Sequence, residues 1–177
     1  MREPEELFQK HSLAALRTIF SVGEPLNPEV IVWGRTALGK QIYDTWFQTE
    51  TGAIMIANRP GQHVKPGSMG TPACGIEPAI LDDAGNPLPP NQQGQLCLKT
   101  GWPSMFVTYL HNQAAYSSKF RNGYYLTGDM AWQDNDGYYW FVGRSDDVIN
   151  TAGHLVSPFE IESALLELPE KIGRAHV

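Results

Sequence analysis

Closely spaced turn signals divide the stretch from residue 66 to residue 144 into short runs. The turns are Asp82-Asp-Ala-Gly85, Pro87-Leu-Pro-Pro90, Asn122-Gly123 and Asn135-Asp-Gly137, and the last is followed by Tyr138-Tyr-Trp-Phe-Val142. Asn-Gly and Asp-Gly pairs adopt the positive φ of tight hairpin turns with little strain. Aromatic and β-branched residues are common in strands. The stretch therefore predicts a small antiparallel barrel or sandwich.

The residues before this stretch predict an α/β unit. Asn27-Pro-Glu29 supplies a helix N-cap, a proline for the first turn and an acid near the helix N-terminus. The helix is expected to continue to about Leu38 and to end at Gly39, a residue that adopts the left-handed conformation easily. Apolar runs over residues 16–20 and 41–46 flank it. Strand, helix and strand in this order are typical of a parallel sheet.

Two more helices are expected, one near each end of the chain. Residues 5–17 are interpreted as a short helix. Ser157-Pro-Phe-Glu160 fits a capping box, and Ile161, Leu165 and Leu168 then fall on one helical face. The second helix would begin a third structural unit.

Composition excludes several classes of protein. Apolar residues make up 42% of the chain and charged residues 18%, which is ordinary for a globular domain. The net charge of −6 and the lack of any Lys/Arg run argue against a nucleic-acid or anionic-membrane partner. Cys74 and Cys97 have no metal-ligand spacing, which favours two reduced thiols. No signal peptide and no apolar run of about 18 residues occurs, so a soluble cytoplasmic protein is expected.

Four segments concentrate acids, hydroxyls and glycines, the residue types of a phosphate and ribose site. They are Ser21–Pro25, Tyr43–Gly52, Tyr125–Asp129 and Gly143–Glu162. The first two follow the predicted parallel strands, and parallel sheets bind ligands at the carboxyl ends of their strands.

In this order the four segments resemble the adenylate-forming superfamily of acyl-CoA synthetases, and most closely its AMP-forming acetyl-CoA synthetases. The resemblance extends over about residues 7–170 and implies ATP, Mg²⁺ and CoA as cofactors and a small carboxylic acid, acetate first, as substrate. The family's Gly/Ser/Thr-rich phosphate loop and its distant catalytic lysine do not occur in the sequence. The chain is therefore expected to be an internal fragment that is itself inactive.

The family's adenine loop corresponds to Gly23, Glu24 and Pro25, and its acyl-facing residue to Val22. A glycine permits close approach of the backbone to a flat ring, and a proline stiffens the loop. As a tripeptide, the same sequence is also an ordinary turn.

The segment after the second strand supplies the largest set of implied contacts. The resemblance assigns ATP contacts to Asp44, Thr45, Trp46, Gln48 and Thr49, and the magnesium ligand to Glu50. Carboxylate oxygens suit a hard cation, and hydroxyls suit phosphate oxygens. On its own, the pair Thr49-Glu50 fits a helix N-cap followed by a first-turn acid better than it fits a metal site, and only the surrounding match to the family favours the latter.

Two charged residues farther along correspond to the ribose end of the family's site. Asp129 matches the ribose ligand, since a carboxylate accepts hydrogen bonds from both hydroxyls of a diol, and Arg144 matches its partner near ribose and phosphate. The alternative is a hairpin cap at Asp129 and a surface ion pair at Arg144.

The remaining assignments concern motion and specificity. Asp146 matches the family's hinge and, with Thr49 and Glu50, completes the implied catalytic set; Gly153 would line the pantetheine tunnel or be a simple loop glycine. Phe47 stands where many acetyl-CoA synthetases have a tryptophan that floors the acyl pocket. Leu155 replaces a common arginine, which puts that phosphate contact in doubt.

The resemblance also implies a division of the chain. Residues 1–65 would be the C-terminal part of an α/β nucleotide-binding subdomain, residues 66–145 a small antiparallel β-barrel subdomain, and residues 146–170 the hinge and start of a mobile C-terminal domain. Residues 171–177 are expected to be a non-native tail, because their coding sequence is compatible with read-through into a sequencing adapter. Two alternatives to an acetate–CoA ligase stay open: a propionate or medium-chain acyl-CoA synthetase, favoured by Phe47, and a non-catalytic nucleotide-binding module.

Overall fold

Among the three β-sheets of the described residues, the first contains the end of the predicted α/β unit. The computed structural model describes residues 10–147, 149–151 and 154–156 and the single residues 158, 161 and 165. In the first sheet, the strands lie in the order β1 (Ile19–Ser21), β2 (Ile42–Trp46), β3 (Ile56–Ala57) and β4 (Thr71–Pro72). β1 and β2 are parallel, and the other pairs are antiparallel. A 3₁₀ turn, η1 (Thr49–Thr51), follows β2.

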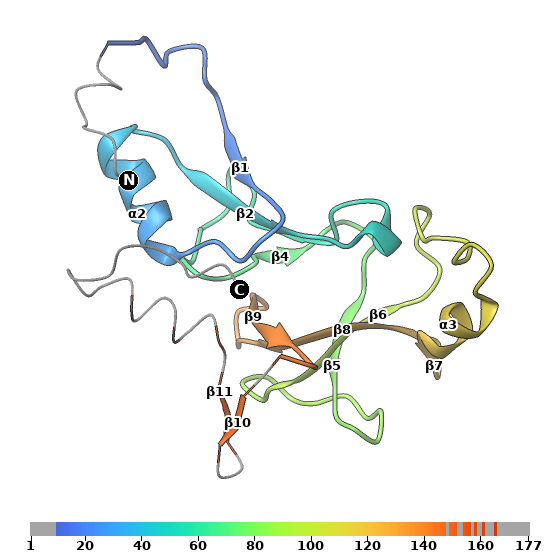
Figure 1. Cartoon of the computed structure of the whole chain (residues 1–177). Helices are drawn as coiled ribbons and strands as arrows, with labels where there is room; N and C mark the ends of the chain where they lie inside the picture. Colours follow the sequence, from blue (N-terminus) through green and yellow to red (C-terminus); the bar gives the residue numbers. More distant parts are fainter. Residues whose placement is uncertain are drawn as a thin grey trace.

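Helix α2 (Pro28–Ala37) connects the two parallel strands, as the capping signals predict (Figure 1). The Asn27 side chain accepts a hydrogen bond from the Glu29 N–H at 2.8 Å, and Pro28 occupies the first turn. Gly39 has a φ of 61° just after the helix. Ile31 is fully buried and packs with apolar residues before and after the helix, so this face of α2 holds it against β2.

The second sheet is antiparallel and has five strands. These are β5 (Pro78–Leu81), β6 (Gly94–Lys99), β7 (Phe120–Arg121), β8 (Tyr124–Gln133) and β9 (Tyr139–Arg144). They lie in the order β5-β6-β8-β7, with β9 also paired to β8. Helix α3 (Gln113–Ser118) precedes β7. The Asn122-Gly123 turn between β7 and β8 has φ of 50° and 81°, which explains why it needs those residues. The predicted order, an α/β part followed by antiparallel β, is confirmed.

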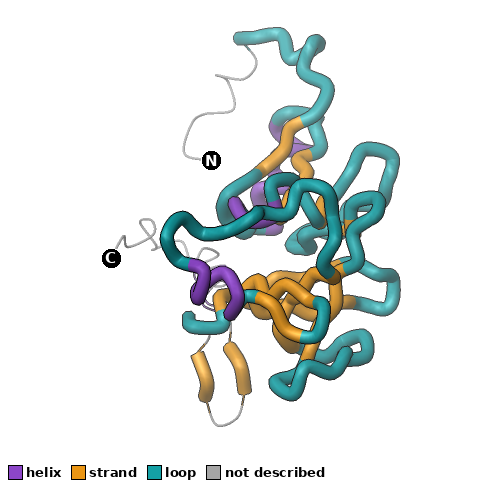
Figure 2. The backbone as a smooth tube through the Cα atoms, turned by 90° about the vertical axis from the view of Figure 1, so that its right-hand side faces the viewer, coloured by secondary structure: helices purple, strands orange, loops and turns teal. Residues whose placement is uncertain are grey.

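One hydrophobic core joins the first two sheets. Its buried members come from both: Trp46 and Ile56 from the first, and Leu96, Leu98 and Tyr125 from the second, among others. The Met69 N–H donates to the Tyr139 carbonyl and the Tyr139 N–H to the Gly70 carbonyl, both at 2.9 Å. Figure 1 shows the strands of the first sheet lying beside β8 and β9 of the second, and Figure 2 shows the two groups of strands from another side. The carboxyl ends of β1 and β2 are thereby brought next to β8 and β9.

The chain ends differ from the sequence-based expectations. Residues 10–17 contain turns and a bend but no helix, so the helix predicted over residues 5–17 is wrong for its described part. Leu13 and Leu16 are only half-buried there, and a short segment gains too little from packing to offset helix nucleation. The hairpin of β10 (Ile149–Thr151) and β11 (His154–Val156) was not predicted. The capping box at Ser157 lies outside the described residues. Within the described part of the chain, no helix is long and apolar enough to span a membrane.

Candidate functional site

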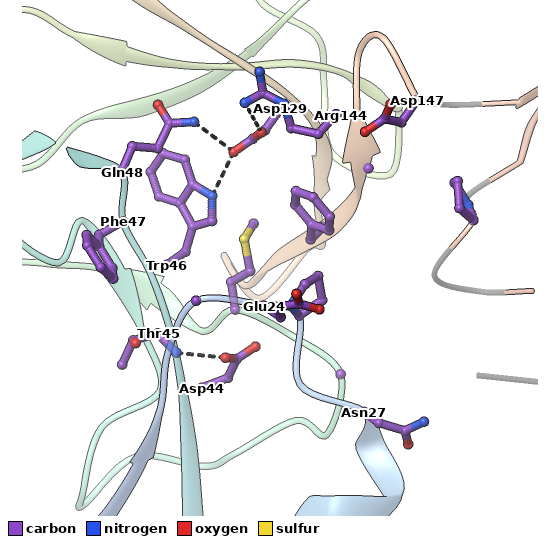
Figure 3. Close-up of a pocket in the computed structure, with 17 residues that line it drawn as sticks. Glu24, Asn27, Asp44, Thr45, Trp46, Phe47, Gln48, Asp129, Arg144 and Asp147 are labelled. Carbon is purple, nitrogen blue, oxygen red and sulfur yellow. Dashed lines mark hydrogen bonds and ion pairs between the residues drawn. The ribbon is translucent and has the colours of Figure 1, made fainter. Parts of the chain in front are cut away.

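A cavity of about 540 Å³ lies where the two sheets meet, and most of the predicted site residues line it (Figure 3). Its predicted members are Gly23, Glu24, Pro25, Asp44, Thr45, Trp46, Phe47, Gln48, Asp129 and Arg144. Asn27, Gly67, Met69, Phe141, Gly143, Asp147 and Pro158 complete the lining and were missed from the sequence. A cavity of this volume is of the size that holds a small ligand.

Asp129 is the most heavily bonded carboxylate of the cavity. Its Oδ2 accepts from the Trp46 indole Nε1 at 2.9 Å and from Gln48 Nε2 at 3.1 Å, and its Oδ1 accepts from Arg144 Nη1 at 3.0 Å. Figure 3 shows these groups converging on it. Burial raises the pKa of Asp129, although the indole, the guanidinium and the amide each lower it. The carboxylate is thus held in one orientation before any ligand arrives.

The Gln48 amide is itself fixed by a tyrosine. The Tyr125 hydroxyl donates to Gln48 Oε1 at 2.8 Å, and Gln48 Nε2 also donates to the Thr127 carbonyl at 3.0 Å. Tyr125, Thr127 and Asp129 are all buried on β8, because alternate residues of a strand face the same side. The signal that could have identified Tyr125 is its spacing of four residues from Asp129 along one strand, which places both side chains on the same face.

Asp44 lies at the opposite end of the cavity from Asp129 (Figure 3). It is 5% exposed, and burial raises its pKa from 3.8 to about 7, against the lowering effect of backbone hydrogen bonds from Thr45 and Leu26. The Thr45 N–H bond to Asp44 Oδ1 is 2.9 Å, and the Thr45 hydroxyl donates to the Ser21 carbonyl at 2.7 Å. These bonds tie the end of β2 to the end of β1.

The raised pKa of Asp44 predicts a pH-dependent effect of Asp44→Asn. A carboxyl whose pKa is higher in the folded state stabilises the fold below its unfolded pKa, and this contribution is lost as pH rises through about 7. Asparagine stays neutral and keeps an acceptor for the Thr45 N–H. We expect a gain over wild type of about 1 to 2 kcal/mol at about pH 5, which grows to at most about 4 kcal/mol at about pH 8.

Thermal unfolding followed at both pH values measures this effect. Asp83→Asn, at an exposed turn residue, is the matched control and should change stability little at either pH. An equal effect of Asp44→Asn at the two pH values would contradict the buried, neutral carboxyl.

The Thr49-Glu50 pair lies in η1, just outside the cavity lining. Glu50 Oε1 accepts the Tyr109 hydroxyl at 2.7 Å, and the Glu50 carbonyl accepts the Phe106 N–H at 3.0 Å. The Trp102 indole donates to the Thr51 carbonyl at 3.0 Å. The segment from Trp102 to Tyr109 therefore fixes both the backbone and the carboxylate of this turn. Sequence reasoning missed Tyr109.

Glu50 is suited to be a carboxylate ligand of Mg²⁺. Among the described residues, no group of three or more His, Cys, Asp or Glu forms a metal site by itself. Mg²⁺ usually keeps several waters and takes one or two carboxylates together with substrate phosphates. The half-buried Glu50 has one carboxylate oxygen bonded to Tyr109, so its other oxygen suits this role.

The other predicted residues lie apart from the lining. Val22 is 59% exposed, Thr49 is exposed, and Asp146 is an exposed residue whose Oδ1 lies 3.6 Å from Arg144 Nε. Gly153 lies outside the described residues. The roles predicted for these four residues stay predictions.

Comparison with known proteins identifies the family to which this geometry belongs. The family model described as AMP-binding enzyme matches residues 1–110. The chain is 52% identical over 166 residues to the acetyl-coenzyme A synthetase of Bacillus subtilis, covering 93% of this chain and 29% of that protein. It is 41% identical over 172 residues to the mitochondrial acyl-coenzyme A synthetase ACSM4 of Homo sapiens, covering 96% of this chain and 30% of that protein.

A solved structure agrees with the sequence comparisons. The anthranilate CoA ligase AuaEII, in complex with anthranoyl-AMP, superposes with a TM-score of 0.84 and 37% identity, covering 92% of this chain and 31% of that one. The chain thus spans less than a third of the length of these relatives. With a family model matched over more than half of its residues, the chain belongs to the family of AMP-binding enzymes.

Proposed function

We propose that the chain is part of a longer acetate–CoA ligase and contributes most of its nucleotide site. One observation carries the proposal: the ends of β1 and β2 face Asp129 and Arg144 of the second sheet across a shared cavity. Asp129 would accept the ribose hydroxyls, and Arg144, 45% exposed, would reach the phosphate. The loop Gly23–Pro25 and Asp44 would border the adenine at the other end. The acetyl-coenzyme A synthetase relative supports acetate as the acid.

The proposed reaction has two steps. The carboxylate of the acid attacks the α-phosphorus of ATP, which gives the acyl-AMP and releases pyrophosphate. The thiolate of CoA then attacks the acyl carbon, and AMP leaves with the electron pair of the broken C–O bond. In both steps, the residues of this chain act by positioning the nucleotide and by stabilising charge.

Mg²⁺, held by Glu50 together with the phosphates of ATP, would neutralise their negative charge. The Tyr109 hydroxyl would keep the Glu50 carboxylate turned toward that position. The one CoA contact that the resemblance assigns, Gly153, lies outside the described residues, so CoA stays a proposed substrate.

Acid-dependent exchange of pyrophosphate into ATP tests the proposal in the full-length protein. We expect exchange with acetate, together with binding of AMP. Binding of AMP without exchange for any short or medium-chain acid would favour a non-catalytic nucleotide-binding module instead.

Phe47 supports a second candidate, a ligase for propionate or a medium-chain acid. It lines the cavity and is 40% exposed, and its ring is smaller than the tryptophan of many relatives. If Phe47 floors the acyl pocket, Phe47→Trp should raise the preference for acetate over butyrate roughly tenfold, because each methylene is worth about 1–3 kcal/mol of discrimination.

The ratio of kcat/KM for the two acids measures this preference. Phe20→Trp is the matched control, since Phe20 on β1 is 50% exposed and does not line the cavity. An unchanged ratio in Phe47→Trp would contradict the assignment of Phe47 to the acyl pocket. An equal change in both variants would show that the effect is not specific to Phe47.

A further inference from the structure

Tyr125 is buried at the end of a hydrogen-bond chain that leads to the ribose end of the cavity. Its side chain is 1% exposed, and it does not line the cavity. The hydroxyl donates to Gln48 Oε1 at 2.8 Å, and Gln48 Nε2 donates to Asp129 Oδ2 at 3.1 Å. Each link joins β8 to the residues after β2, so the chain bridges the two sheets.

The Gln48 amide can form all three of its hydrogen bonds in only one orientation. In that orientation its oxygen accepts from Tyr125, and its nitrogen donates to Asp129 Oδ2 and to the Thr127 carbonyl, two groups that only accept. Turning the amide over would place its oxygen against both acceptors. Without the Tyr125 hydroxyl, the amide oxygen loses its donor and the flexible Gln48 side chain loses its anchor.

We propose that Tyr125 is a positioning residue for nucleotide binding, acting through the Gln48 amide on the Asp129 carboxylate. The inference rests on the proposed function, since it takes Asp129 as the group that binds the ribose. Tyr125 would touch neither substrate nor the reacting atoms. Its effect would be to keep one donor aimed at Asp129 Oδ2 and so to hold that carboxylate ready for the diol.

The test is the binding of AMP to the full-length protein, measured by calorimetry for wild type, Tyr125→Phe and Tyr139→Phe. Tyr139 is the matched control: it is 3% exposed, belongs to the same core, and donates to the Pro78 carbonyl at 3.2 Å instead of to Gln48. We expect Tyr125→Phe to weaken AMP binding roughly tenfold, the loss typical of one buried hydrogen-bond partner, and Tyr139→Phe to leave it unchanged.

The pH dependence of AMP binding separates positioning from a general loss of stability. The groups that face Asp129 are Arg144 on β9, Trp46 at the end of β2 and Gln48 just after it. The other acidic groups at or beside the cavity are Glu24, Asp44, Glu50, Asp146 and Asp147. Because the Gln48 amide lowers the pKa of Asp129, weakening that bond raises it. AMP affinity falls at low pH as Asp129 becomes protonated, and we call this part of the pH profile the acid limb. The acid limb should therefore shift to higher pH in Tyr125→Phe and stay in place in Tyr139→Phe. Asp44 titrates in all variants, so the difference between variants is the readout.

A third substitution keeps the test decisive if Tyr125→Phe folds poorly. Gln48→Met removes the amide and keeps the length of the side chain, and it should shift the acid limb in the same direction. If Tyr125 acts through Gln48, adding Tyr125→Phe to Gln48→Met causes no further loss of AMP affinity.

Three results would overturn the inference alone: equal AMP affinity in Tyr125→Phe and Tyr139→Phe, an unshifted acid limb in Gln48→Met, or additive losses in the double variant. Failure of the wild-type protein to bind AMP would overturn the proposed function and the inference with it.

Discussion

Replacing Asp129 with Asn is expected to weaken binding of AMP to the full-length protein by roughly 100-fold, the loss of a charge-assisted bond within a buried network. The carboxylate now accepts from Trp46 and Gln48 on one oxygen and from Arg144 on the other. Asparagine has the same shape but only one acceptor oxygen, so its NH₂ group must face either the guanidinium or the indole and amide donors. The negative charge that compensates Arg144, and that would receive the ribose diol, is also lost. Calorimetric titration with AMP measures the effect.

Asp134→Asn is the matched control for this prediction. Asp134 Oδ2 also accepts from a cation and an indole, Lys65 Nζ at 2.6 Å and Trp140 Nε1 at 3.2 Å, but it does not line the cavity. Losing that ion pair should lower stability and leave AMP affinity unchanged. Similar AMP affinities in wild type and Asp129→Asn would contradict the assignment of Asp129 to the ribose site. Equal losses of affinity in Asp129→Asn and Asp134→Asn would indicate misfolding.

The parts of the fold that the sequence predicts are those determined by local chemistry. Asn27 caps α2 through a bond to a residue two positions away, and Gly39 and Asn122-Gly123 supply positive φ that other residues adopt only with strain. These preferences act within a few residues, so one sequence is enough to find them. The 5–17 helix had no such capping pair, and its described part is not helical.

The contacts within the site depend on long-range pairing that no local pattern determines. Trp46 and Asp129 are 83 residues apart, Gln48 and Tyr125 are 77 apart, and Glu50 and Tyr109 are 59 apart. The family resemblance predicts most of the residues that line the cavity. It does not predict that two tyrosines fix the amide and the carboxylate, because these bonds appear only once the second sheet packs on the first.

The near-neutral pKa of Asp44 is a further property that the sequence alone does not reveal. It arises because the carboxyl is buried between β1, β2 and the loop before α2, where burial outweighs two backbone donors. Residue type predicts an ordinary carboxylate at this position. Only the packing around it determines the protonation state.

The second prediction with a large expected effect concerns Glu50 and the metal. Glu50→Gln should lower acid-dependent pyrophosphate exchange by roughly 100- to 1000-fold, the range for losing one electrostatic contact to a charged transition state. Glutamine keeps an acceptor oxygen for the Tyr109 hydroxyl, so the turn should keep its shape, but a neutral amide is a poor ligand for a hard cation. Exchange should therefore need more Mg²⁺ to reach half of its maximum.

Binding of AMP without Mg²⁺ distinguishes a metal ligand from a residue needed for folding. It should be unchanged in Glu50→Gln, since Glu50 does not line the cavity and the donors to Asp129 stay in place. Glu77→Gln, which removes an exposed partner of Lys99, is the matched control and should alter neither measurement. If Glu50→Gln keeps the wild-type dependence on Mg²⁺, Glu50 is not the metal ligand. If it loses AMP affinity as well as exchange, Glu50 acts through the structure of η1.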